Sequence, residues 1–270
     1  MKEDLVSVII PTKNSAETIE LCLKSIKDQN YPAIETIVVD NYSDDETADI
    51  ARKYARVFQK GPERSTQRNH GVENAKGKYV VIIDSDMELT PNVIKECVHE
   101  ISKKDVAAFI IPEISVGEGF WTKCKALERS CYIGDDTIEA ARFFDKNIFL
   151  EMGGYDEDIA GGGEDWDLPQ RIKKAGYGTG RIESLIKHHE GRLSLTKTMR
   201  KKLYYAKTIR RYIKKHPDMA SKQIVLIRPA YIRHWRRLAR DPLHTIGFMF
   251  MKMCEFAAGG VGFVVSRMVG

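Results

Sequence analysis

The sequence lacks the cysteine spacings that mark a disulfide framework or a zinc site. It has five cysteines, an odd number, and no two of them stand in a C-x-x-C pattern. They are Cys22, Cys97, Cys124, Cys131 and Cys254. We therefore expect free thiols in a reducing compartment, with neither disulfides nor structural zinc.

Two further patterns are missing near the N-terminus. Residues 1–4 lead directly into an apolar strand pattern, without the basic start, apolar core and small-residue cleavage site of a secretory signal. The loop after that strand, Pro11-Thr12-Lys13-Asn14, contains no glycine, whereas a nucleotidyltransferase is expected to carry a glycine-rich phosphate loop there. A secretory leader is therefore not expected, and a nucleotidyltransferase is the less favoured enzyme class.

Positive and negative charge are unevenly distributed along the chain. The net charge is only +5, yet residues 1–191 carry 25 Lys+Arg against 35 Asp+Glu, a net of −10. Residues 192–240 carry 16 basic residues against Asp218 alone, a net of +15, and residues 241–270 are neutral. An acidic body is thus joined to a strongly basic segment, which indicates an anionic partner.

Apolar, β-rich runs alternate with helical patterns through the first part of the chain. The predicted strands are 5–10, 34–39, 79–83 and 106–111, and the predicted helices are 16–29, 43–56 and 91–102. Ser43, followed by Glu46 three residues later, has the pattern of a capping box for the second helix. This alternation predicts an α/β fold, with a doubly wound, mostly parallel, Rossmann-like sheet within a domain of residues 1–191.

Two carboxylates follow the predicted strand 79–83. Asp84 and Asp86 are two residues apart, so in extended chain they face the same way while Ser85 turns aside. Ligands of open α/β sheets collect at the carboxyl ends of the strands. Hard oxygen ligands suit Mg²⁺ or Mn²⁺, and these ions suit a diphosphate. The sequence therefore predicts a divalent cation at Asp86 and Asp84.

Four segments occur in the order typical of one known family. They are Pro11-Thr12-Lys13-Asn14, Asp40, Asp84-Ser85-Asp86 and the stretch 162–168, Gly-Gly-Glu-Asp-Trp-Asp-Leu. Gln67-Arg68-Asn69-His70-Gly71 and Gly153-Gly154-Tyr155-Asp156 support them. With these motifs, residues 6–191 resemble the family 2 glycosyltransferases, which have a GT-A fold. The resemblance implies an inverting transfer of a sugar from a nucleotide diphosphate donor.

The resemblance places the donor at the first loops. Asp40 is expected to accept hydrogen bonds from the nucleobase or the ribose, and Thr12 and Asn14, in the loop opened by Pro11, to contact the same nucleoside. Arg68 is expected to clamp a phosphate or a sugar hydroxyl, and Asp84 and Ser85 to line the nucleotide-sugar site.

The same resemblance assigns the chemistry. Asp165 is the candidate general base, Glu164 orients it or contacts the acceptor, and Trp166 stacks on an acceptor sugar or packs in the core. A third metal ligand is expected from His188, because the pattern His-x-Glu-Gly is the form that similar family members show; His189 is the alternative.

The C-terminal part predicts membrane association. Residues 192–240 are expected to form basic amphipathic helices at an interface, and residues 241–270 a hydrophobic membrane-anchoring segment, spanning or interfacial. A helix over 243–269 would be about 40 Å long, enough to reach across a bilayer. The preceding basic residues favour a catalytic domain on the cytoplasmic side. Nucleic-acid binding is the rejected alternative.

Together these patterns predict a membrane-associated, Mn²⁺- or Mg²⁺-dependent hexosyltransferase. We expect GDP-mannose as donor and a polyprenyl- or dolichyl-linked acceptor. A UDP-sugar-dependent enzyme of cell-surface polysaccharide synthesis is the alternative, and a non-catalytic nucleotide-sugar binding protein is the second. The Gln-x-x-Arg-Trp element of processive cellulose synthases is absent after residue 165, which argues against processive polymer synthesis.

Overall fold

The computed structural model describes residues 3–102, 106–159, 162–206 and 209–269. It forms two compact units, each built from separate stretches of chain. The first comprises Met1–Pro112, Ala140–Glu157 and Asp165–His188, and the second comprises Glu113–Glu139, Asp158–Glu164 and His189–Gly270. Residues 113–139, which lie within the predicted domain 1–191, thus belong to the second unit.

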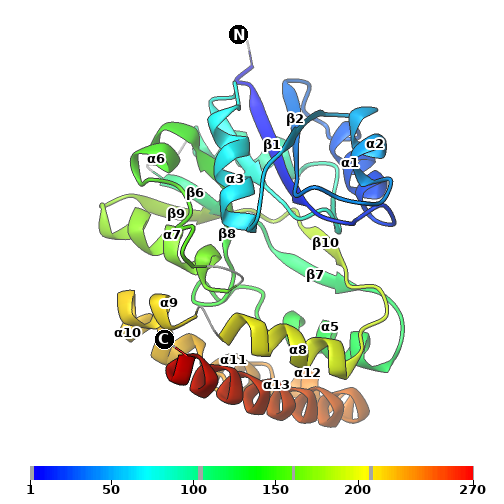
Figure 1. Ribbon diagram of the computed structural model, residues 1–270, viewed down its shortest axis with the longest axis vertical. Helices are drawn as coiled ribbons and strands as arrows, with labels where there is room; N and C mark the ends of the chain where they lie inside the picture. The colour runs from blue at the N-terminus through cyan, green and yellow to red at the C-terminus, as the bar shows by residue number, and fades with distance from the viewer. Residues whose placement is uncertain (1–2, 103–105, 160–161, 207–208, 270) are drawn as a thin grey trace. The chain divides into compact units, whose positions relative to one another are not determined.

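The first unit is built on a central sheet with the strand order β3-β2-β1-β4-β8-β6-β9 (Figure 1). These strands are β1 (Val6–Thr12), β2 (Ile34–Asp40), β3 (Arg56–Gln59), β4 (Tyr79–Ile82), β6 (Val106–Ile110), β8 (Ala141–Asp145) and β9 (Gly178–Arg181). Strands β1 to β4 are parallel, and β6 is parallel to β9. The prediction of an α/β fold with a mostly parallel sheet is confirmed.

One strand interrupts this parallel order. β8 lies antiparallel between β4 and β6, with Val80 opposite Phe144 and Val81 opposite Phe143. Its sequence is short and follows an irregular region, so no local pattern reveals its direction or its neighbours. A second, antiparallel pair joins β5 (Met87–Leu89) to β10 (Ile186–His189), with His188 opposite Met87.

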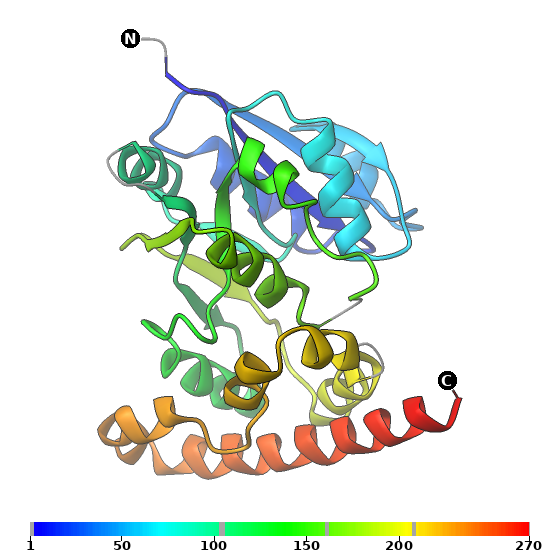
Figure 2. The same cartoon turned by 90° about the vertical axis from the view of Figure 1, so that its left-hand side faces the viewer.

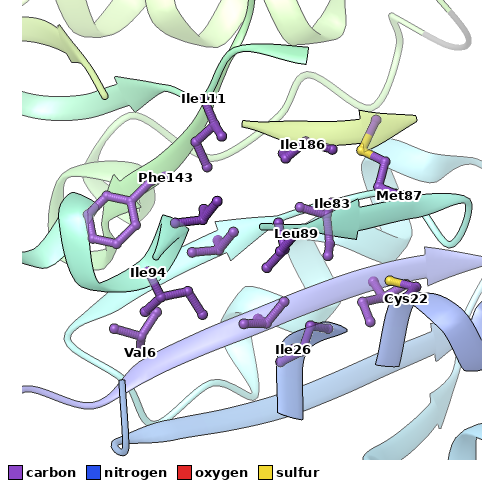
Figure 3. Packing of buried hydrophobic residues seen from close by; sticks show 14 of the residues in the cluster. Val6, Cys22, Ile26, Ile83, Met87, Leu89, Ile94, Ile111, Phe143 and Ile186 are labelled. Carbon is purple, nitrogen blue, oxygen red and sulfur yellow. The ribbon is translucent and has the colours of Figure 1, made fainter. Parts of the chain in front are cut away.

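Alternate residues of the central strands pack on opposite faces of the sheet, as the pleat requires. Val8 and Ile10 belong to one buried cluster, and Ile9 between them belongs to the other. The first cluster includes residues of α1 (Ile19–Lys27) and α4 (Val93–Ile101), and Figure 3 shows it from close by. The second includes residues of α3 (Arg64–Glu73), α6 (Lys146–Glu151) and α7 (Glu164–Lys174). Because helices cover both faces of the sheet, the apolar strand segments that the sequence predicted are buried.

The second predicted helix starts later and is shorter than expected. α2 spans Thr47–Arg52, and Glu46, not Ser43, is its N-cap residue. The predicted capping box is wrong because the Ser43 hydroxyl donates to Asp40 Oδ1 at 2.5 Å instead. Residues 53–55 form a turn after α2, and Arg56 begins β3, which the sequence did not reveal.

The second unit is mainly helical. It contains β7 (Glu113–Val116), α5 (Phe120–Ser130), α8 (Leu195–Ala206), α9 (Ile209–Lys215), α10 (Pro217–Gln223), α11 (Pro229–Arg233), α12 (Trp235–Ala239) and α13 (Pro242–Val269). Figure 2 shows α13, in orange to red, as one long helix at the edge of this unit. Residues 242–264 of α13 are long and apolar enough to cross a membrane, although 39% of that stretch is buried inside the protein.

Candidate functional site

The predicted site residues gather where β1, β2 and β4 end. Thr12 and Asp40 are register partners at the carboxyl ends of β1 and β2, and Asp84 follows β4 by two residues. Because these strands are parallel, their ends lie at one edge of the sheet, where open α/β sheets bind ligands. The topology thus brings Thr12, Asp40 and Asp84 to one edge of the sheet, and their part in a binding site stays a prediction.

The first loops are tied together by short polar contacts. Asp40 is fully buried and accepts hydrogen bonds from the backbone N–H and hydroxyl of Ser43. Asn14, whose φ of 49° lies in the left-handed region, donates its N–H to Ser43 Oγ, and its side-chain oxygen accepts from the Asp44 N–H. The carboxylate predicted to contact the nucleoside thus also holds the shape of the loop that would surround it.

Three other predicted donor residues lie beside these loops. Thr12 is buried, and its Oγ1 has no hydrogen-bond partner, which leaves a polar atom for a ligand to satisfy. Pro11 is the register partner of Val39 inside the sheet. Ser85 donates to Ser15 Oγ at 2.9 Å. Their contacts to a donor stay a prediction.

Arg68 occupies the centre of the site. Its side chain is fully buried; Nη1 donates to Asp165 Oδ1 at 2.7 Å and Nη2 donates to Asp84 Oδ1 at 2.9 Å. One guanidinium therefore joins the carboxylate after β4 to the carboxylate of α7, although 97 residues separate Arg68 from Asp165. Charge-assisted bonds of this kind are strong and directional, so they fix both carboxylates.

The two supporting motifs hold this arginine in place. The Arg68 guanidinium lies 5.1 Å from the centre of the Tyr155 ring. The neighbouring Asn69 donates to the Tyr155 carbonyl and accepts from the Tyr155 N–H, both at 2.9 Å. A Cβ at Gly154, where φ is 64°, would meet Asn69 Oδ1 at 2.5 Å. The glycine is thus required for the close approach that locks α3 to this turn.

Asp84 lies in a strongly positive environment. Burial alone would raise its pKa, but the guanidinium groups of Arg68, Arg142 and Arg64 outweigh burial and hold the pKa of Asp84 well below its usual range. Arg142 Nη2 lies 3.9 Å from Asp84 Oδ2, and its Nη1 donates to the Ile82 carbonyl. Asp84 is therefore an ionised carboxylate held by arginines in this structure, and its predicted role as a metal ligand stays a prediction.

Asp86 and His188 form the pair that fits a metal ion. His188 Nε2 lies 3.2 Å from Asp86 Oδ2, because β10 pairs with β5 directly after Asp86. Asp86 Oδ1 is buried and has no hydrogen-bond partner, so a cation would satisfy it. A carboxylate and an imidazole suit Mn²⁺ or Mg²⁺, with further positions left for water and phosphate. Within residues 3–102, 106–159, 162–206 and 209–269, no group of three or more His, Cys, Asp or Glu residues converges to hold a metal.

The alternative ligand, His189, is the next residue of the same strand. Successive side chains of a strand point to opposite faces, so His189 does not share the face on which His188 meets Asp86. This geometry favours His188 over His189; that His188 binds a metal stays a prediction, which a metal-binding comparison of the two histidines tests.

The acidic motif forms the start of α7. Asp165 is partly exposed, whereas Glu164 and Asp167 are buried. Asp167 Oδ2 accepts from Arg171 Nε at 2.7 Å, and Arg171 donates from Nη2 to the Gly154 carbonyl at 2.5 Å. Asp165 is thus the exposed carboxylate of this motif and contacts Arg68, and its role as general base stays a prediction. Trp166 is half-buried, and its predicted stacking on a sugar stays a prediction.

Sequence reasoning missed two residues of this site. Arg142 lies on β8 among apolar residues and carries no local signal, so its place beside Asp84 follows only from strand pairing. Tyr155 was noted as part of a glycine-rich motif, but its contact with Arg68 was not foreseen. The available signal was that residues 67–71 and 153–156 both support the same family resemblance. The structure shows that these two segments are in contact.

Part of the sequence is similar to known proteins. A family model described as Glycosyl transferase family 2 matches residues 7–155. The uncharacterized glycosyltransferase YibD of Escherichia coli is 35% identical over 95 residues, which is 33% of this chain and 28% of the relative. Glycosyltransferase AglE of Haloferax volcanii is 38% identical over 93 residues, 30% of each protein. The matched region thus spans less than a third of each relative's length.

Solved structures share the fold. The mannosyltransferase PcManGT from Pyrobaculum calidifontis, solved with GDP-Man and Mn²⁺, has a TM-score of 0.61 at 19% identity, over the whole of this chain and 76% of that one. S. aureus TarS 1–349 has a TM-score of 0.57 at 16% identity, over 98% of this chain and 92% of that one. At such identities the likeness establishes the GT-A fold. With more than half of its residues matched by the family model, the chain belongs to glycosyl transferase family 2.

Proposed function

We propose that the protein is an inverting, metal-dependent hexosyltransferase that uses a nucleotide-sugar donor. The observation that carries this proposal is the contact of Arg68 with both Asp84 and Asp165. It joins the end of β4, where a diphosphate is expected, to the candidate base. A donor and an acceptor hydroxyl bound at these two groups would meet in one site.

The proposed donor is GDP-mannose, with a UDP-hexose as the alternative. The structural neighbour that covers the whole chain is a mannosyltransferase solved with GDP-Man, which supports the first choice. TarS was also solved with UDP-GlcNAc, which keeps the second choice open. The buried, unpartnered Thr12 hydroxyl and the Asp40 loop supply the polar groups for a base and a ribose.

Asp86 and His188 would hold the cation, with Asp84 as a further carboxylate. A bound Mn²⁺ or Mg²⁺ supplies stabilisation of the negative charge that develops on the leaving nucleoside diphosphate. Arg68 and Arg142, both buried beside Asp84, add fixed positive charge on the protein side.

Asp165 would act on the opposite side of the reaction. The acceptor oxygen bonds to the anomeric carbon as the bond from that carbon to the diphosphate oxygen breaks, and the acceptor proton passes to the Asp165 carboxylate. Attack from the face opposite the leaving group inverts the anomeric centre. The bond from Arg68 orients Asp165, and Glu164 and Trp166 are proposed to contact the acceptor.

The proposed acceptor is a sugar hydroxyl on a polyprenyl- or dolichyl-linked glycan. A phosphate oxygen is already nucleophilic at neutral pH and needs no base, so the presence of Asp165 favours a hydroxyl over a bare lipid phosphate. The apolar helix α13 and the basic residues before it support a membrane-bound acceptor and a catalytic unit on the cytoplasmic side.

The test is release of nucleoside diphosphate from a panel of GDP- and UDP-sugars. Reactions contain Mn²⁺, Mg²⁺ or EDTA, in membranes with and without polyprenyl-linked glycans. We expect one donor to be turned over, only with metal and only with acceptor. Donor binding without turnover under every condition would instead favour a non-catalytic nucleotide-sugar binding protein.

A further inference from the structure

Within the second unit, a buried cluster of charges joins α13 to α5. Lys125 and Glu128 of α5 meet Lys252 and Glu255 of α13 in a closed ring of ion pairs. The distances are 2.9 Å for Lys125–Glu128, 3.5 Å for Lys125–Glu255, 3.0 Å for Lys252–Glu128 and 2.8 Å for Lys252–Glu255. Each helix contributes one cation and one anion, and two of the four ion pairs, Lys125–Glu255 and Lys252–Glu128, join α5 to α13.

The same face of α13 is closely packed along its length. Phe248 and Met251 are fully buried and join the cluster that contains Cys124 and Tyr231. A Cβ at Gly247 would meet the Phe120 ring at 2.5 Å, and one at Gly262 would meet the Leu203 carbonyl at 2.6 Å. The two glycines therefore let α13 approach α5 and α8 at points 15 residues apart.

The opposite face of α13 is exposed and apolar. Its exposed large side chains recur at intervals of three or four residues, with Ala257 and Gly260 in the gap, and no charged residue interrupts them. They are Leu243, Ile246, Phe250, Met253, Val261 and Val264. This outer stripe is about 30 Å long at a rise of 1.5 Å per residue. An uncovered apolar surface of this length indicates a binding partner.

Exposed basic and aromatic side chains accompany the outer stripe. α11 and α12, which directly precede α13 in the chain, expose Trp235 and Ile232 together with Arg233 and Arg236, and Arg240, the C-cap residue of α12, is also exposed. Tryptophan beside apolar residues and arginines is typical of a membrane interface. A second copy of the chain is a poor occupant, because it would bring two segments of net charge +15 together. An anionic bilayer complements both the charge and the apolar stripe.

We propose that α13 lies in the plane of an anionic membrane surface, with its outer stripe in the lipid and its inner face packed on the second unit. Crossing the bilayer would instead separate Lys252 and Glu255 from Glu128 and Lys125 of α5 and place both charges of α13 in the hydrocarbon. The outer stripe would enter the headgroup and acyl boundary to about 5–10 Å. From the proposed function this inference takes only the location at a membrane.

The first test measures binding of the full chain to phosphatidylcholine vesicles with and without phosphatidylglycerol. We expect binding to the anionic vesicles, weakened on the order of 10- to 100-fold by Ile246→Ser/Phe250→Ser. The change Arg233→Gln/Arg240→Gln should weaken it about fivefold per arginine and reduce its salt dependence. The matched control, Leu21→Ser/Leu150→Ser, replaces exposed leucines of the first unit and should leave binding unchanged.

Binding of nucleoside diphosphate, measured without vesicles, shows whether each variant is folded. This measurement does not depend on the membrane. Equal vesicle binding by the outer-stripe variant and the wild type would overturn the proposal. A second copy of the chain would instead cover the stripe if the wild type were a dimer in solution without vesicles and this variant a monomer. That result, with vesicle binding unchanged, would also overturn the proposal.

The second test distinguishes lying from crossing. A protease-cleavable epitope is placed after Gly270, and sealed vesicles with the cytoplasmic side outward are treated with protease. An in-plane helix leaves the epitope outside, so we expect it to be removed as fast as an epitope placed at the N-terminus. Protection of the C-terminal epitope until detergent is added would show that α13 crosses the bilayer.

Discussion

Arg68 Nη1 lies 2.7 Å from Asp165 Oδ1, and the same guanidinium also binds Asp84. The Arg68–Asp165 pair links helix α3 to the first turn of α7. With its second bond to Asp84, the buried arginine is a spacer that separates the donor end of the proposed site from the acceptor end. Because the guanidinium is a planar fork, the two carboxylates are held at a fixed separation.

Arg68→Lys should therefore damage transfer more than binding. An ammonium is a single point charge and cannot reproduce two divergent bonds, so we expect turnover to fall about 100-fold while the donor Kd changes little. Steady-state kinetics and calorimetric donor titration measure the two quantities. Arg52→Lys, at an exposed arginine of α2, is the matched control. Unchanged turnover in Arg68→Lys would remove the spacer role.

The neighbouring histidines give an internally controlled test of the metal site. His188→Ala should weaken Mn²⁺ binding on the order of 10- to 100-fold, whereas His189→Ala should leave it nearly unchanged, because only His188 faces Asp86. Mn²⁺ binding in the presence of nucleoside diphosphate is measured by electron paramagnetic resonance, independently of turnover. A larger loss in His189→Ala would reverse the assignment.

Glu35 is expected to make the stability of the first unit sensitive to acid. Burial would raise its pKa, but the Ser7 hydroxyl, the N–H groups of Lys76 and Gly77, and Arg56 together lower it below 4.5. The unfolded chain therefore binds more protons than the folded chain at acidic pH. The stability from Glu35 is present above pH 4.5 and is lost as the pH falls through its folded pKa.

Glu35→Gln should lower the free energy of unfolding by about 1–3 kcal/mol at neutral pH and by less in acid. Urea denaturation at a series of pH values measures this difference. Glu17→Gln, at an exposed glutamate, should change stability by less than about 0.5 kcal/mol. An equal loss in Glu35→Gln at neutral and acidic pH would exclude the ionised carboxylate as its cause.

The ion-pair ring of the second unit predicts a strong non-additivity. Lys252→Met removes the cation that contacts both Glu128 and Glu255 in the ring and should cost about 3–5 kcal/mol of unfolding free energy. Lys252→Met/Glu255→Gln restores charge balance and should recover most of that loss. Denaturant titration of both variants gives the coupling energy; additive effects would mean that the ring does not act as a unit.

Much of the fold was predictable because the first strands have a clear local sequence pattern. The apolar runs ending at Asp40 and Asp84 predicted both strands and the edge at which they end. Ser43 was misassigned because a helix cap and an Asp40 hydrogen bond compete for one hydroxyl, and only the fold decides between them. Arg142 was missed because it reaches Asp84 through an antiparallel pairing that no sequence period encodes.

The C-terminal helix illustrates the same limit. Its length and apolar character were predicted from composition, but the partners of its two central charges, Lys252 and Glu255, were not. The structure gives these residues partners on α5, far away in the sequence, and thereby separates an inner face from an outer one. Such pairings depend on tertiary packing, which is why the sequence left spanning and interfacial helices undecided.

The most direct test of the account is nucleoside diphosphate release by wild type, Asp86→Asn and Asp165→Asn, with the preferred donor, Mn²⁺ and acceptor. We expect Asp86→Asn to lose metal-dependent turnover, and Asp165→Asn to retain donor binding while transfer falls on the order of 10²- to 10⁴-fold. Full transfer by Asp165→Asn would contradict the base assignment, and full metal-dependent turnover by Asp86→Asn would contradict the metal site.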